Sequence, residues 1–235
     1  MMSAQRFYHG TSSVYLDSIR ETGLGAVNPN QRYRLLDLLS HLLHSFEAAF
    51  PDDISTLQFR RFARAMANQS QFDEVFNGRT HVLNFRNNNT YVAFHPSRAM
   101  RYAAINRFGS EVLTNCVTLH ELLRSRGWQD EIPQDLNTIE LDSIQTQSSF
   151  PVFIEVDSIR PEMLLDEYGG SGVKKLRQIE KLRLALSEED FFRESQLWNF
   201  ELLRPIPYEL LKIHRLIVGG DPRSPQARFT LGERH

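Results

Sequence analysis

The sequence predicts a protein of the α+β class, with β-strands and amphipathic helices mixed along one chain. Five segments are rich in Val, Ile, Tyr and Phe, as strands are: residues 6–11, 90–94, 150–157, 197–203 and 213–218. Two other segments carry apolar residues at helical spacing, and we expect helices there: residues 33–50 and 55–67. At 235 residues, the chain is long enough for one substantial domain.

Composition and charge exclude several classes of protein. A content of 41% apolar and 24% charged residues is ordinary for a globular protein. The formal net charge of −2 gives no basic field of the kind that attracts nucleic acids or membranes. No apolar run approaches the roughly 18–20 residues that span a bilayer, and no signal peptide opens the chain. We therefore expect a cytoplasmic protein without membrane association.

Cys116 is the only cysteine, so neither an intrachain disulfide nor a cysteine-based zinc site can form. It lies in the apolar run 112–117, which predicts a buried structural thiol rather than a nucleophile. His41 and His44 are spaced for one helix face, but no third ligand accompanies them. We expect no metal site.

The first strand, residues 6–11, ends in a motif of unlike residues. Phe7 and Tyr8 are typical of a buried strand that ends at His9. Gly10 allows the backbone to come close to a ligand without an intervening side chain. The serines that follow can cap a helix over residues 14–20, which closes at a glycine. Taken alone, this motif is equally typical of a helix start with a surface histidine.

The stretch from residue 30 to residue 76 is interpreted as a helical insertion, a candidate cap or lid. Its second helix places Arg60, Arg61 and Arg64 away from the apolar stripe. These arginines are typical of a solvated face, with a phosphate-contacting patch as the lesser alternative. The glycine-rich run 169–172 lacks the spacing of a phosphate loop, and we interpret it as a mobile connector.

Two later segments carry further candidate residues. Tyr91 opens the strand 90–94, and Tyr102 follows eleven residues later on a helix that Ser97 can cap. Arg98 and Arg101, on the same helix, are candidates to grip a phosphate. Glu201 lies among apolar residues of the strand 197–203. A buried unpaired carboxylate is costly and tends to be functional, although strand alternation can also turn it to water.

These motifs, taken in order along the chain, resemble the ADP-ribosyltransferase fold. The carriers are His9-Gly10-Thr11, Tyr91 with Tyr102, and Glu201 followed by Ile-Pro and a short helix. The resemblance is to the branch of the poly(ADP-ribose) polymerases and diphtheria toxin. It implies an ADP-ribosyltransferase-like split β-sheet core of two packed small sheets with helical insertions. The domain would span residues 1–220, followed by a loose tail over 221–235.

The resemblance also implies the chemistry. NAD would be the substrate, and its nicotinamide–ribose bond breaks through a transition state in which positive charge builds on the sugar. Glu201 would stabilise that charge, with His9 holding a ribose hydroxyl and Tyr91 stacking on nicotinamide. We expect the NAD-binding residues to be His9, Gly10, Thr11, Tyr91, Arg98 and Tyr102.

The expected function is mono-ADP-ribosyl transfer to an unknown macromolecular acceptor, protein or nucleic acid, by a toxin or effector with an antitoxin or immunity partner. Two departures qualify the resemblance. Asn199 stands where arginine-specific transferases carry a second glutamate, and Ala99 replaces a serine that holds the nicotinamide carboxamide. The alternatives are an RNA 2'-phosphotransferase-like enzyme, which shares the opening motif, and a catalytically inactive nucleotide- or protein-binding member of the fold.

Overall fold

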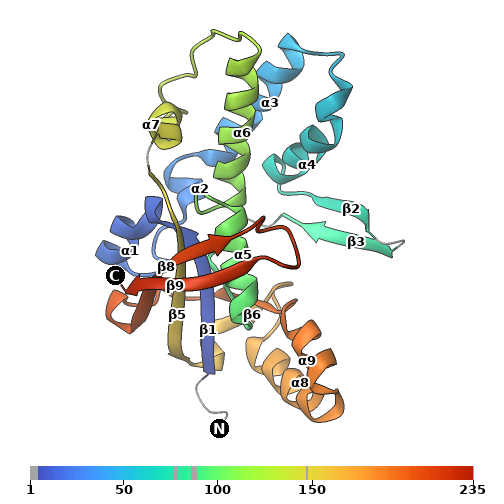
Figure 1. The fold of residues 1–235 in the computed structure, drawn as a ribbon, viewed down its shortest axis with the longest axis vertical. Coiled ribbons are helices and arrows are strands. Elements are labelled where there is room, and N and C mark those ends of the chain that lie inside the picture. The colour runs from blue at the N-terminus through green and yellow to red at the C-terminus, as the bar shows by residue number, and fades with distance from the viewer. Residues whose placement is uncertain (1–4, 77–78, 86–88, 147, 235) are drawn as a thin grey trace. The chain divides into compact units, whose positions relative to one another are not determined.

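The chain folds into two compact units, each assembled from separate stretches of sequence. The first comprises residues 1–27, 89–109 and 149–235, and the second comprises residues 28–88 and 110–148. The computed structural model describes residues 5–76, 79–85, 89–146 and 148–234 (Figure 1). Residues 1–4 and 235, at the ends of the expected domain and tail, lie outside that part. The expected insertion, 30–76, falls within the second unit, which also takes in residues 110–148.

The first unit is built on one antiparallel sheet of seven strands. In sheet order these are β6 (Leu164–Asp166), β7 (Asn199–Leu202), β4 (Tyr91–Ala93), β1 (Gln5–Ser12), β5 (Pro151–Ile159), β8 (Leu211–Gly219) and β9 (Arg228–Arg234). One sheet thus replaces the two small sheets that we expected. The physical reason is the pair Tyr8↔Ala93, which joins β1 to β4 and keeps the hydrogen-bonded ladder continuous.

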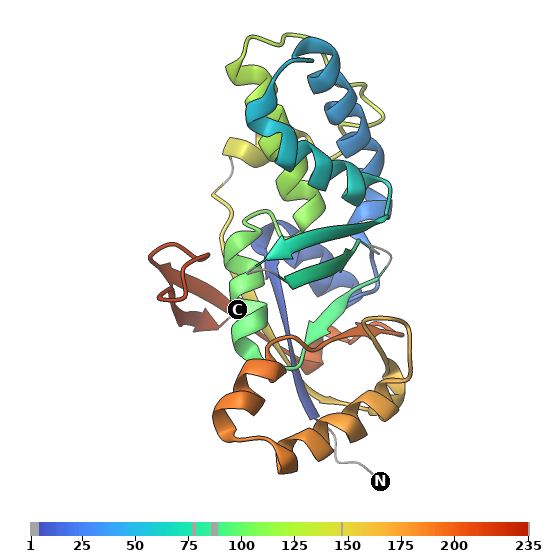
Figure 2. The same cartoon turned by 90° about the vertical axis from the view of Figure 1, so that its right-hand side faces the viewer.

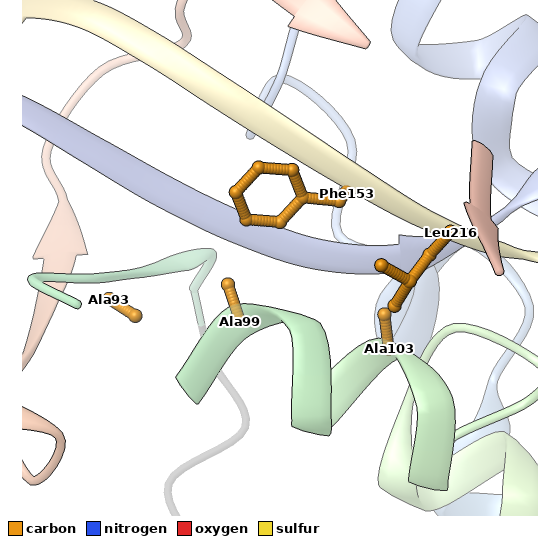
Figure 3. Close-up of a cluster of buried hydrophobic side chains, with 5 residues drawn as sticks. All are labelled: Ala93, Ala99, Ala103, Phe153 and Leu216. Carbon is orange, nitrogen blue, oxygen red and sulfur yellow. The ribbon is translucent and has the colours of Figure 1, made fainter. Parts of the chain in front are cut away.

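Helix α5 (Pro96–Ile105) covers one face of this sheet. Its small residues Ala99 and Ala103 project toward Phe153 on β5 and Leu216 on β8, and all four are almost fully buried (Figure 3). Alanines let the helix approach the strands closely, so that one cluster of apolar side chains ties α5 to both β5 and β8. Because α5 follows β4 with only Phe94 and His95 between them, this cluster also positions β4.

The remaining helices of the first unit are α1 (Leu16–Thr22), α8 (Gly172–Ala185) and α9 (Glu188–Ser195). Helices α8 and α9 pack against each other (Figure 2). Helix α9 is not evident in the sequence, because its many charged residues hide the helical period. Its capping serine, Ser187, hydrogen-bonds the backbone of Asp190 at 3.1 Å.

The second unit is mainly helical. It holds α2 (Pro29–Arg32), α3 (Leu35–Ala49), α4 (Leu57–Ala67), α6 (Glu111–Ser125) and α7 (Leu141–Thr146), together with the hairpin β2 (Gln71–Phe76) and β3 (Arg79–Asn84). Helix α3 packs against α6, and its leucines other than Leu36 are buried, as the apolar period predicted. Cys116 on α6 is buried, which raises the pKa of its thiol and confirms the interpretation of a structural cysteine.

The loose tail is a correction to the sequence analysis. Residues 228–234 form β9, which pairs with β8 along most of its length. The connecting loop is fastened by Arg101 on α5, whose guanidinium donates to the carbonyls of Pro222, Arg223 and Ser224 at 3.1, 3.4 and 3.2 Å. A side chain far away in sequence therefore fixes this loop, and the local sequence of the loop does not predict that contact.

Candidate functional site

Three residues that are far apart in sequence lie on three adjacent strands. His9 is on β1, Tyr91 on β4 and Glu201 on β7, and these strands are consecutive neighbours in the sheet. Tyr91 and Glu201 are direct partners in the β4–β7 ladder, so their side chains share one face. His9 Nδ1 lies 2.7 Å from the carbonyl oxygen of Tyr91. Neighbouring strands are about 4.8 Å apart, but the pair Tyr8↔Ala93 sets Tyr91 in phase with Tyr8 and Gly10, so the His9 side chain leaves β1 on the opposite face.

The sheet parts at this row. Strand β1 pairs with β5 from Gln5 to Ser12, but within the described residues its pairing with β4 is confined to Tyr8↔Ala93. Beyond that pair, no backbone pairing joins His9 or Gly10 to Tyr91 in the described residues. The His9 side chain, rather than a backbone ladder, makes the contact between β1 and β4 there.

The hydrogen bond of His9 fixes its tautomer. A carbonyl oxygen can only accept, so Nδ1 carries the proton and donates to Tyr91. Burial lowers the pKa of His9 from its ordinary value of 6.5, which keeps the ring neutral at pH 7. Its Nε2 atom is therefore a lone-pair acceptor, and it suits a hydroxyl group as donor.

Glu201 is half-buried and is oriented by Asn89, whose side-chain amide donates to the carboxylate Oε1. None of the ion pairs among the described residues involves this carboxylate. A carboxylate that is positioned by an amide and not neutralised by a cation keeps its full charge for a bound group. Sequence analysis missed Asn89, because an asparagine in a turn-like run carries no signal of its own.

Gly10 has a packing role that we did not expect. The space that its side chain would occupy is filled by α5, since a Cβ would stand 2.0 Å from the carbonyl oxygen of Ala99 and 2.9 Å from the nitrogen of Ala103. The glycine therefore admits a helix on this side, and only the strand edge of its backbone faces the parting. Thr11 is 2% exposed, so its side chain is closed to a bound molecule in this structure.

The two other expected residues lie on α5. Tyr102 is half-buried and precedes Ala103, whose backbone abuts Gly10. Arg98, in the first turn, is exposed and acts electrostatically on Glu167. Arg101 was also a candidate to grip a phosphate, but its guanidinium is committed to the three carbonyls of the β8–β9 loop.

Glu167 is the second residue that sequence analysis missed. It follows β6 directly, and desolvation by the surrounding protein raises the pKa of its carboxyl. The run 169–172 beside it is ordered, which corrects the expectation of a mobile connector. Asp166 accepts hydrogen bonds from the backbone nitrogens of Tyr168 and Gly170 at 3.0 and 2.7 Å, and Leu165 bridges to Ser171.

Comparison with known proteins adds nothing to this geometry: no family model, no curated protein and no solved structure matches the chain. Within the described ranges, His, Cys, Asp and Glu side chains do not gather in groups of three or more that could hold a metal ion. Across the same ranges, no helix combines the length and the apolar character that crossing a membrane requires.

Proposed function

We propose that the chain is a mono-ADP-ribosyltransferase that cleaves the nicotinamide–ribose bond of NAD and transfers ADP-ribose to a macromolecular acceptor. The observation that carries the proposal is the row of His9, Tyr91 and Glu201 on adjacent strands, at the place where β1 and β4 part. These residues come from three motifs that the sequence spreads over almost the whole chain.

The chemistry of the row suits NAD. When the bond to nicotinamide breaks, the ribose acquires oxocarbenium character, and a fixed anion beside it lowers the barrier. Glu201, held by Asn89 and paired across the ladder with Tyr91, supplies such an anion. A flat nicotinamide ring gains on the order of 1 kcal/mol from an aromatic neighbour such as Tyr91.

The remaining groups orient the substrate. The neutral His9 ring presents Nε2 as an acceptor, which fits a ribose hydroxyl. The backbone of Gly10 lies at the parted edge of β1, where peptide groups can meet a carboxamide. Across the α5 contact Gly10 meets the backbone of Ala99, whose methyl group is buried in the cluster with Phe153.

The parted sheet also supports the proposed split core. The three strands β6, β7 and β4 form one half, and β1, β5, β8 and β9 form the other, with Tyr8↔Ala93 as the described junction. A cleft in such a core needs strands that stay adjacent but unpaired. This arrangement is what we propose as the NAD-binding cleft of an ADP-ribosyltransferase.

Nicotinamide release from NAD tests the proposal, with Glu201→Gln beside the wild type. Glutamine still accepts the Asn89 hydrogen bond but lacks the charge, so we expect release to fall about 10²–10³-fold with NAD binding retained. Glu209→Gln, an exposed glutamate on the turn before β8, is the matched control and should behave as wild type. The wild type is assayed alone and in lysate, which supplies acceptors.

Equal release by wild type and Glu201→Gln would refute the assigned role of the carboxylate. If neither the pure protein nor the lysate mixture released nicotinamide, and calorimetry showed no NAD binding, the transferase proposal would be wrong. The protein would then be better described as an inactive, partner-binding member of the same architecture.

A further inference from the structure

Helix α4 runs beside α3 in the second unit (Figure 1), and its last turns line a cavity of about 270 Å³. The lining residues that the structure describes are Arg61, Arg64, Ala65 and Asn68 on the helix and Ser70 just after it. The helix positions recur every three or four residues, so their side chains share one face of α4. Two of the arginines that the sequence offered for phosphate contact therefore border a concave surface.

A Schellman motif ends α4 and shapes this cavity. Gln69 has a φ of 49° and donates its backbone N–H to the oxygen of Met66 at 3.0 Å. Ser70 donates its backbone N–H to the oxygen of Ala65 at 2.9 Å, which brings Ser70 back against the last turn. The carbonyl groups at the end of a helix carry partial negative charge, which repels anions. Because these carbonyls are hydrogen-bonded within the turn, that repulsion is reduced at the cavity.

The side chains that line the cavity suit an anion. Arg61 and Arg64 are exposed and bring two positive charges one helical turn apart, and Asn68 adds an amide donor. The described lining residues include no carboxylate. A guanidinium is planar and binds two oxygens of a phosphate at once. A pair of them therefore matches the charge and the several oxygens of a phosphoryl group.

Arg64 is held over α3 by Glu47, whose carboxylate Oε1 accepts a hydrogen bond from Nη2. This ion pair uses one nitrogen of a group that carries five N–H donors, so Arg64 can bind Glu47 and a phosphate oxygen together. Glu47 thus fixes the guanidinium and, as an anion, also competes with a bound phosphate. Neutralising Glu47 should consequently favour an anionic ligand.

Ser70 and the size of the cavity indicate what accompanies the phosphate. The Ser70 hydroxyl donates to the carbonyl oxygen of Ala65 at 3.1 Å, so it presents only lone pairs to a ligand. A ligand hydroxyl is the natural donor to it. The volume of about 270 Å³ lies just under the range of roughly 300–1,000 Å³ for ordinary ligand pockets, so the ligand is small.

We propose that this cavity binds a phosphomonoester with a neighbouring hydroxyl group, as in a sugar phosphate or a nucleoside monophosphate. Arg61, Arg64 and Asn68 bind the phosphoryl oxygens, and Ser70 accepts a hydrogen bond from the hydroxyl. All of these residues belong to the second unit, whereas the proposed NAD-binding row belongs to the first. The inference goes beyond the proposed function and does not rest on it.

Calorimetry on the full chain tests the inference, with ribose 5-phosphate and AMP as probes and ribose as the uncharged comparison. Both phosphates should bind and ribose should not, and the tighter probe distinguishes a sugar phosphate from a nucleotide. The double variant Arg61→Gln, Arg64→Gln should bind at least about tenfold more weakly, the usual effect of losing hydrogen bonds to charged groups. The matched control is Arg193→Gln on α9, an exposed arginine paired with Glu189 at 3.2 Å, which should bind as the wild type does.

Two single variants separate a ligand site from a structural cluster. Glu47→Gln should tighten phosphate binding about two- to fivefold, the size of an exposed ion pair, and no gain would overturn the role of Arg64. Ser70→Ala should weaken ribose 5-phosphate about threefold and leave inorganic phosphate unchanged, and equal affinities for ribose 5-phosphate would overturn the role of Ser70.

Two outcomes would overturn the site as a whole. One is a folded wild type that binds neither probe, and the other is a double variant that binds both as tightly as the wild type. Glu201→Gln should leave the affinity for ribose 5-phosphate unchanged. Failure of this site and failure of the proposed transferase activity are therefore measured independently.

Discussion

Replacing Gly10 by alanine tests how α5 is seated on the sheet. The added Cβ would stand 2.0 Å from the Ala99 oxygen and 2.9 Å from the Ala103 nitrogen, and both of these are backbone atoms. Ordinary contacts of this kind begin at about 3.5 Å, so α5 would have to move by roughly 1.5 Å. The move would pull Ala99 and Ala103 away from Phe153 and Leu216 in the buried cluster (Figure 3).

The expected cost is large for a single methyl group. Overpacking a well-packed core typically costs 1–3 kcal/mol, and a clash with backbone favours the upper end, about 3 kcal/mol. The φ angle of Gly10 is outside the left-handed region, so the cost is steric and not conformational. With a urea m-value of about 2 kcal/mol/M, the midpoint of unfolding should fall by about 1.5 M.

Gly219→Ala is the matched control for this measurement. It is another strand glycine with an ordinary φ, and the nearest atom to its added Cβ is Arg228 Cβ at 3.7 Å. Its unfolding midpoint, followed by circular dichroism, should stay close to that of the wild type. If Gly10→Ala unfolded at the same urea concentration as Gly219→Ala, the inference that Gly10 exists to admit α5 would be wrong.

Two further predictions concern buried residues beside the row. Ala99→Ser buries a hydroxyl in the apolar cluster with Phe153 and Leu216, which should lower the free energy of unfolding in urea by about 1–3 kcal/mol; an unchanged midpoint of unfolding would contradict the described burial of Ala99. Because burial lowers the pKa of His9 below 6.5, the unfolded chain binds more protons than the folded one under that pH, and stability should fall on acidification. His9→Asn keeps a donor to the Tyr91 carbonyl but cannot titrate, so between pH 6.5 and 5 it should lose less stability than the wild type, by at most about 1.4 kcal/mol per pH unit; equal losses would show that His9 does not titrate as described.

Much of the fold was predictable from local sequence. The apolar periods of α3 and α4 and the β-branched content of β5 and β8 gave their positions to within a few residues. Each of these elements has a strong pattern because one side of it is buried. Helix α9 was not predicted, because all but one of its residues lie outside the core and most of them are charged.

Long-range contacts set what could not be predicted. Strand β9 is held in place by its pairing with β8. The loop before it is held by Arg101, which lies more than a hundred residues earlier in the sequence. The motif residues themselves were identified from the sequence, but the obstruction of Gly10 by α5 was not.

The contacts of α5 explain how β1 and β4 stay adjacent although they share a single backbone pair. In the described residues the ladder between β1 and β4 is a single pair, yet α5 is joined covalently to β4 and packs on β1 and β5 through Gly10 and Phe153. Packing thus replaces the hydrogen bonds that an open edge gives up. It follows that Gly10→Ala should weaken NAD binding together with stability, whereas Glu201→Gln should reduce turnover alone. A Gly10→Ala variant that was destabilised but bound NAD as tightly as the wild type would show that the ligand site does not depend on this helix.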